Sequence, residues 1–174
     1  LHRRQRQMCI RDSIWDIEEI KNLDYKFVET YQKNPSYNHY YHDRFKDILG
    51  NDAYYLPNPM PSFVDEIVQL PLFNFKTVLT GFHRMQPGMV LPPHADPYMN
   101  LQKLYDIHDI EEITRFIIFL EKPKSGHLTQ IENEVYIDVN PGDCIYWKGS
   151  TLHAAYNMGT EDRYTLQITG VPNE

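Results

Sequence analysis

Turn-forming residues divide the second half of the chain into short extended segments, and this division constrains the fold more than any other feature. Between the turns, β-branched and aromatic residues predict strands at 75–86, 90–96, 114–121, 127–132, 134–139, 143–147, 152–157 and 163–169. Many short strands with regular turns are typical of a β-sandwich or barrel. The turn signals are Pro87-Gly88, Lys124-Ser125-Gly126, Asn140-Pro141-Gly142, Lys148-Gly149 and Met158-Gly159.

The first part of the chain is more polar and favours helices. Apolar residues recur at helical spacing from residue 14 to 23, with Phe27 and Val28 near the next turns, and predict one helix. A second, short helix is predicted at 43–49, ending at Gly50. A third begins after Ser62 and stops before Pro71. Helices followed by strands indicate helices packed outside a β core.

The length of 174 residues fits one domain with three parts. Residues 1–13 read like translated sequencing-adapter sequence, and we expect them not to be native. Residues 14–72 form a helical and loop part, and residues 73–174 form the β core.

Composition excludes several classes of protein. The net charge is −7, and the basic residues of the first twelve positions make the remainder still more acidic, so duplex nucleic acid is not an expected partner. The longest apolar run, 116–120, is too short to span a membrane. Two cysteines support neither a disulfide scaffold nor a cysteine-rich zinc module, and we expect a reducing, cytoplasmic setting. The oligomeric state is not predicted.

Three residues form a candidate metal site, called here the triad: His94, Asp96 and His153. Pro97 favours an extended conformation for Asp96, and residues i and i+2 of an extended chain point to one face. Two histidines and one carboxylate are the ligand set of non-haem Fe(II) oxygenases, which leaves other coordination positions open. His-x-Asp also arises by chance, and His153 alone would fit a buried structural histidine.

Arg163 lies ten residues after His153. If the intervening segment is a hairpin turn centred near Met158, the two residues are cross-strand partners on one face. Arg163 would then enter the same cavity as the triad and offer a planar fork that suits a carboxylate. Thr165 shares that face. The alternative for Arg163 is an exposed ion pair with Glu161 or Asp162, worth under about 1 kcal/mol.

These residues together resemble the 2-oxoglutarate/Fe(II)-dependent dioxygenases, in the prolyl-hydroxylase or aspartyl/asparaginyl-hydroxylase branch. The resemblance covers about residues 73–170 and implies a mainly β, double-stranded β-helix (jelly-roll, cupin-like) fold with the N-terminal helices outside. It implies that His94, Asp96 and His153 bind Fe(II) and are catalytic, and that Arg163 and Thr165 bind the cosubstrate 2-oxoglutarate. Arg115 shares a strand face with Ile117 and Phe119, so it either lies at the rim or faces inward to bind 2-oxoglutarate or an anionic substrate. O2 would take the remaining metal position.

The resemblance further implies hydroxylation of an unactivated C–H bond, with release of succinate and CO2. The intact carboxylate ligand Asp96 favours hydroxylation over halogenation. The substrate is expected to be a small molecule or a peptide, and Tyr98, Asn100 and Trp147 are candidates to contact it. Two alternatives share the fold: a cupin-like metalloenzyme that does not use 2-oxoglutarate, and a non-enzymatic jelly-roll binding module.

Overall fold

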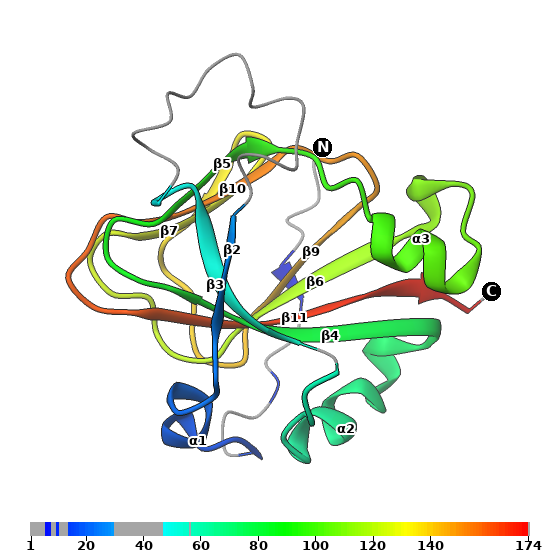
Figure 1. The fold of residues 1–174 in the computed structure, drawn as a ribbon, viewed down its shortest axis with the longest axis horizontal. Coiled ribbons are helices and arrows are strands. Elements are labelled where there is room, and N and C mark those ends of the chain that lie inside the picture. The colour runs from blue at the N-terminus through cyan, green and yellow to red at the C-terminus, as the bar shows by residue number, and fades with distance from the viewer. Residues whose placement is uncertain (1–5, 8–9, 11–13, 30–46, 56, 174) are drawn as a thin grey trace.

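The computed structural model describes residues 6–7, 10, 14–29, 47–55 and 57–173, and it consists of two facing antiparallel sheets (Figure 1). The larger sheet has the strand order β1 (Arg6–Gln7), β9 (Cys144–Lys148), β6 (Thr114–Phe119), β11 (Arg163–Pro172), β4 (Phe75–Met85), β3 (Gly50–Tyr55) and β2 (Lys26–Glu29). The smaller sheet has the order β5 (Val90–His94), β10 (His153–Asn157), β7 (His127–Ile131) and β8 (Glu134–Tyr136). The predicted mainly β, double-stranded β-helix architecture is confirmed, and so are all eight strands predicted after residue 74.

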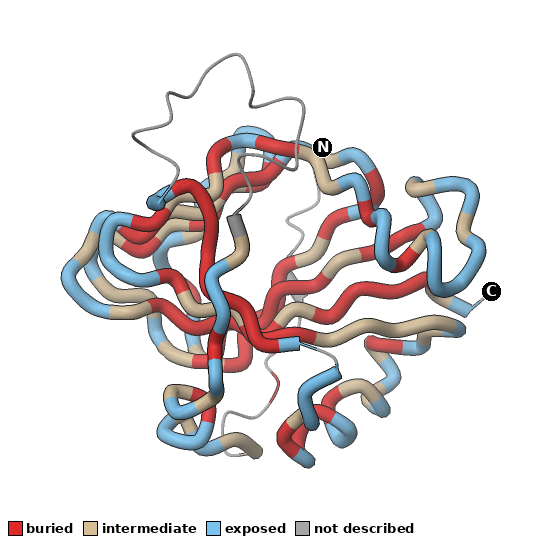
Figure 2. Tube along the Cα trace, in the orientation of Figure 1, coloured by how far each residue is buried: buried red, intermediate tan, exposed pale blue. Residues whose placement is uncertain are grey.

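Two helices cover the outer face of the larger sheet, as predicted. Figure 1 places α1 (Ile17–Lys21) and α2 (Phe63–Val68) on the side of this sheet opposite the smaller sheet. Alternate residues of the central strands point outward and pack against the helices; Phe82 and Ile118, for example, share a buried cluster with Phe63 and Ile67. Burial is continuous along the central strands, whereas the helices expose one side (Figure 2). A third helix, α3 (Met99–Tyr105), and 3-10 turns at Pro71–Phe73 and Ile110–Glu112 were not predicted.

The N-terminal helix predictions were only partly right. Helix α1 ends at Lys21, and Phe27 and Val28 belong to β2, which pairs with β3. The predicted helix at 43–49 falls mostly outside the described residues, and its described end, 47–49, is a turn and an isolated bridge. Gly50 begins β3 instead of capping a helix. Residues 26–29 pair with residues 50–53, which are distant in sequence, so a local helical pattern could not reveal this strand.

The expected hairpin between His153 and Arg163 does not exist. Strand β10 pairs with β5 and β7, while β11 pairs with β4 and β6, so residues 158–162 cross from one sheet to the other. The crossover is held by Asn157, whose amide donates to the carbonyls of Met85 (2.7 Å) and Glu161 (2.8 Å) and accepts from the amide of Gly159 (3.0 Å). Side-chain hydrogen bonds thus replace the ladder that a hairpin would have provided.

His127 and Gly126 also contact the crossover. The His127 ring accepts from the Lys124 amide (3.2 Å) through Nδ1, and its Nε2 lies 2.9 Å from the Glu161 carbonyl oxygen. Gly126 has a φ of +88°, and a Cβ there would lie 2.3 Å from the Gly159 nitrogen. The crossover is therefore a tightly packed arch between the sheets.

The inner face of the larger sheet, which looks toward the smaller sheet, carries most of the polar residues of interest. Strand register places His83, Thr165 and Phe119 in one row across this face. Thr169, Arg115 and Trp147 form another row, and Arg163 lies at the end nearest the crossover. The site described below is built on this face. Within the described residues, none of the helices has the length and hydropathy needed to cross a membrane.

Candidate metal centre and cosubstrate pocket

The structure brings the triad together on the smaller sheet. His94 ends β5, His153 begins β10, and the two residues are register partners. Asp96 follows two residues after His94; its Oδ1 lies 3.7 Å from His94 Nε2, and its Oδ2 lies 3.2 Å from His153 Nε2. One ligand atom from each residue lies within 4.8 Å of the others. Among the described residues, the triad is the group of histidine, cysteine and acidic side chains whose spacing suits a metal ion.

Backbone carbonyls fix which ring nitrogen each histidine presents. His94 Nδ1 lies 2.7 Å from the Pro92 carbonyl oxygen, and His153 Nδ1 lies 3.0 Å from that of Thr151. A carbonyl oxygen only accepts, so each Nδ1 carries the hydrogen, and Nε2 is the ring nitrogen that a metal ion would bind. Burial, together with the neighbouring His153, lowers the pKa of His94 to about 4, which keeps its ring neutral at pH 7. Two lone-pair nitrogens and a carboxylate therefore converge, and this donor set fits a divalent cation such as Fe(II).

Arg115 reaches the triad from the other sheet. Its Nη1 donates to Asp96 Oδ2 at 2.5 Å, its Nε donates to Thr169 Oγ1 at 3.1 Å, and its guanidinium lies 4.9 Å above the Tyr98 ring. Burial by itself raises the pKa of Asp96, but the Arg115 charge and the two histidines outweigh burial and hold this pKa well below its usual range. Asp96 is therefore ionised at neutral pH.

Arg163 is a buried cation inside the barrel. It is 5% exposed; its Nη2 donates to the Thr129 hydroxyl on β7, and its Nη1 contacts Met85 Sδ at 3.3 Å. Its Nε has no hydrogen-bond partner, and none of the described carboxylates lies within 4 Å of the guanidinium. The exposed ion pair considered from the sequence is not formed, since Asp162 accepts from Tyr164 and Glu161 pairs with Lys124. Burial lowers the pKa of Arg163 to about 10, so it still carries its charge.

Strand register gives the spacing between Arg163 and the triad. Thr129, which Arg163 contacts, pairs with Ala155, and Ala155 is two residues along β10 from His153. Two residues of a strand correspond to about 7 Å. Arg163 thus points toward the triad from the larger sheet, across the barrel interior. The expected hairpin would have placed it beside His153 in the same sheet.

His83 also faces this cavity, and sequence reasoning gave it no role. It pairs with Thr165 on the inner face, where burial and the charges of Arg115 and Arg163 lower its pKa to about 4. His83 is half-buried, and its neighbours on the inner face include Thr165. The available signal was a histidine near the end of the eleven-residue strand β4, beside the buried Phe82.

The remaining predicted residues divide into two groups. Thr165 is buried on the same face as Arg163, and the Trp147 ring packs on the His153 ring with centroids 4.3 Å apart. Tyr98 is buried beneath Arg115, with its pKa raised to about 12 mainly by burial, so it remains a neutral phenol. Asn100, in contrast, is exposed on α3, and no described contact links it to the triad.

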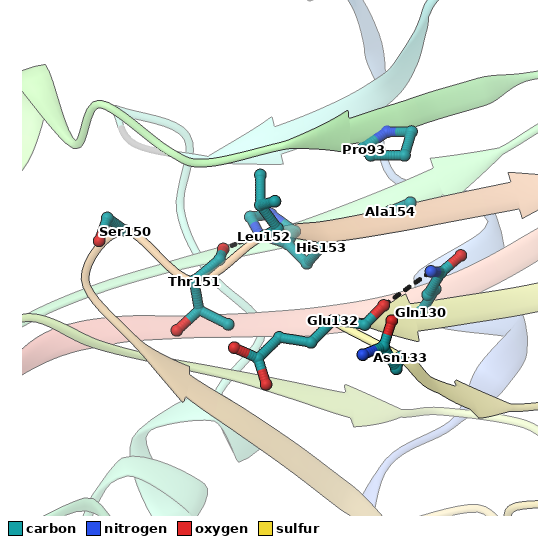
Figure 3. Close-up of a pocket in the computed structure, with 9 residues that line it drawn as sticks. All are labelled: Pro93, Gln130, Glu132, Asn133, Ser150, Thr151, Leu152, His153 and Ala154. Atoms are coloured by element: carbon teal, nitrogen blue, oxygen red, sulfur yellow. Dashed lines mark hydrogen bonds between the residues drawn. The ribbon is translucent and has the colours of Figure 1, made fainter.

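A polar pocket of about 670 Å³ opens beside His153 (Figure 3). Its walls come from β5, β7, β10 and the turns at the mouth of the barrel, and Leu152 stands in front of the His153 ring. The lining residues are Pro93, Gln130, Glu132, Asn133, Ser150, Thr151, Leu152, His153 and Ala154. His153 is the member of the triad that lines this pocket, and Gln130 and Ala154 alternate with the inward-facing Thr129 and His153, so the pocket borders the triad from the outer side of the smaller sheet.

Comparison with solved structures concerns the fold alone. A prolyl-4-hydroxylase from Pseudomonas putida has the same fold, with a TM-score of 0.51 and 11% identity over 93% of this chain and 98% of that one. A predicted oxalate decarboxylase from Thermotoga maritima is more distant, with a TM-score of 0.46 and 10% identity over 94% of this chain and 99% of that one. No curated protein matches the sequence significantly.

The family comparison is more specific. The model of the aspartyl/asparaginyl β-hydroxylases matches residues 56–171, about two thirds of the chain, and this range includes the triad, Arg115 and Arg163. It begins shortly before α2 and ends within β11, so it spans both sheets of the barrel. The chain therefore belongs to the aspartyl/asparaginyl β-hydroxylase family, one of the two branches that the sequence resembled.

Proposed function

We propose that this protein is an Fe(II)- and 2-oxoglutarate-dependent oxygenase that hydroxylates an unactivated C–H bond. The observation that carries the proposal is the Arg163 guanidinium, which is buried and has no described carboxylate partner. A buried charge without a partner is costly, so such a group is kept where an anionic ligand completes it. The family membership and the converging triad support the same conclusion.

The spacing favours a dicarboxylate as that ligand. The estimate of about 7 Å from the contact point of Arg163 to the triad suits a five-carbon diacid that binds the metal at one end and Arg163 at the other. Thr165, on the same face as Arg163, would donate a second hydrogen bond to the far carboxylate.

The residues of this chain would bind, orient and shield the reactants. His94, Asp96 and His153 would hold Fe(II), which, together with 2-oxoglutarate and O2, supplies the oxidising chemistry with release of succinate and CO2. Phe119, Ile131 and Trp147 form an apolar wall that excludes water from this cavity. A small-molecule or peptide substrate would approach the triad at the mouth of the barrel, near His153.

Anaerobic spectroscopy tests the proposal directly. Fe(II) and 2-oxoglutarate added together to the protein should produce a weak visible charge-transfer band that neither produces alone. The Arg163→Met variant should need at least tenfold more 2-oxoglutarate for the same band, because the charge-assisted pair would be lost, while its metal affinity changes little. Lys76→Met, an exposed cation on neighbouring β4, serves as the control for loss of charge.

The outcomes separate the alternatives. A metal-bound protein without the band would indicate a cupin-like enzyme that does not use 2-oxoglutarate. A protein that binds no metal would contradict the proposal and favour a binding module. A fall in metal affinity in Arg163→Met would indicate that Arg163 supports the triad structurally instead of binding the cosubstrate.

A further inference from the structure

We propose that Arg115 is a positioning residue that orients Asp96 for the metal, an inference that rests on the proposed function. The sequence indicated instead that an inward-facing Arg115 binds 2-oxoglutarate or an anionic substrate. In the structure its strongest contact is with Asp96 itself, at 2.5 Å, and this contact links the two sheets. Both partners are largely buried, with 15% and 14% of their side chains exposed.

Arg115 is itself held on three sides, which suits a rigid support. Thr169, its register partner on β11, accepts from Nε, and the face of the Tyr98 ring lies under the guanidinium. Tyr98 has a φ of +48°, a conformation that a bulky residue adopts only where its surroundings impose it. Since Tyr98 comes two residues after Asp96, this strained backbone brings the ring under Arg115 and the carboxylate in front of it.

The two oxygens of Asp96 are not equivalent. Each oxygen faces one histidine, with Oδ1 3.7 Å from His94 Nε2 and Oδ2 3.2 Å from His153 Nε2, but only Oδ2 also accepts the short bond from Arg115. An oxygen engaged in a charge-assisted hydrogen bond is a weaker metal ligand, so Arg115 would reserve Oδ2 and leave Oδ1 for the metal. Asp96 would then bind through one oxygen, in a fixed orientation, and more coordination positions would stay open for reactants.

The electrostatic effect of Arg115 opposes its positioning effect. A guanidinium near a divalent cation repels it, so removal of the charge alone would tighten metal binding. Loss of an outer-sphere partner, in contrast, usually weakens metal binding about 10- to 100-fold. The direction of the change therefore distinguishes positioning from a purely electrostatic role.

Metal binding without cosubstrate tests the inference. Co(II) titrations should give Arg115→Gln a dissociation constant about 10- to 100-fold above wild type, with a changed intensity of the cobalt d–d bands as Asp96 binds through both oxygens. Arg115→Lys, whose ammonium cannot reach Thr169 and Asp96 as a fork, should lose roughly threefold to tenfold. Lys76→Met should match wild type. Near-ultraviolet circular dichroism of the metal-free variants checks folding, and Arg115→Lys carries the test if Arg115→Gln does not fold.

A double-variant cycle checks that Arg115 acts through Asp96. In the Asp96→Asn background, Arg115→Gln should change cobalt affinity less than threefold, because the carboxylate that Arg115 holds is gone. Unchanged or tighter cobalt binding in Arg115→Gln, with a weaker response to 2-oxoglutarate, would overturn the inference and return Arg115 to the cosubstrate. Wild-type protein that binds no cobalt would instead contradict the proposed function.

Discussion

His83 provides a prediction whose size follows from the structure. Its pKa is lowered to about 4 in the folded protein, while an unfolded chain has a histidine pKa of about 6.5. As the pH falls, the unfolded chain takes up this proton first, so protonation favours unfolding. The free energy of unfolding should be unaffected by His83 above about pH 7.5, should fall as the pH drops through about 6.5, and should level off below the folded pKa.

The expected loss from this one group is about 2 kcal/mol at pH 5 and approaches about 3 kcal/mol at lower pH. His83→Gln keeps a polar side chain of similar reach but cannot take up a proton. Urea denaturation of the metal-free proteins at pH 7.5 and pH 5 should therefore show wild type losing about 2 kcal/mol more than His83→Gln. Comparison of the two proteins cancels the titration of His94 and of exposed groups.

Two observations would refute this reasoning. If wild type and His83→Gln lose the same stability within about 0.5 kcal/mol, His83 is not buried as a neutral ring between two guanidinium groups. A ring pKa of His83 near 6.5 in an NMR titration of the folded protein would lead to the same conclusion.

Three further predictions concern the arch between the sheets and the metal. Asn157→Ala should lower the free energy of unfolding by about 1–3 kcal/mol in urea denaturation, because it removes the side-chain donor to the Met85 carbonyl and one of the two contacts at the Glu161 carbonyl; a loss below about 0.5 kcal/mol would contradict this account. Gly126→Ala should cost at least about 1 kcal/mol in the same assay, since its φ is positive and its Cβ would meet Gly159; equal stability would show that the arch can relax. Metal-free protein should melt at a higher temperature once Co(II) is added, and His94→Ala or Asp96→Ala should abolish that rise and turnover alike; persistent stabilisation would place the metal elsewhere.

The β core was predictable because its signals are local. Turn pairs such as Pro141-Gly142 mark strand ends whatever the strands pair with, and the eight predicted strands follow from them. The outer strands β2 and β3 carry no such marks. In β3, Asn51 and Asp52 are polar yet buried, with Asp52 held by Arg84 and Gln86, contacts that no local pattern indicates.

The site residues likewise differ in whether local sequence or distant segments determine their positions. The position of His94 relative to Asp96 depends on two residues of extended chain, and the prediction was right. Arg163 faces the cavity as predicted, but for a different reason: side-chain alternation is a local property of a strand, whereas the choice of partner strand depends on distant segments. His83 was missed because the face of an isolated strand cannot be assigned until its neighbours are known.

The arch at 158–162 fixes the number of residues between the end of β10 and the start of β11. One uninterrupted segment carries the proposed metal ligand His153 and the proposed carboxylate anchor Arg163, and hydrogen bonds of Asn157 and His127 hold the link between them. A single insertion or deletion in this link would change the distance between the two ends of a bound diacid and turn the next side chain outward. We therefore expect the length of the arch to determine which 2-oxo diacids bind. Variants with a longer arch should accept a longer cosubstrate.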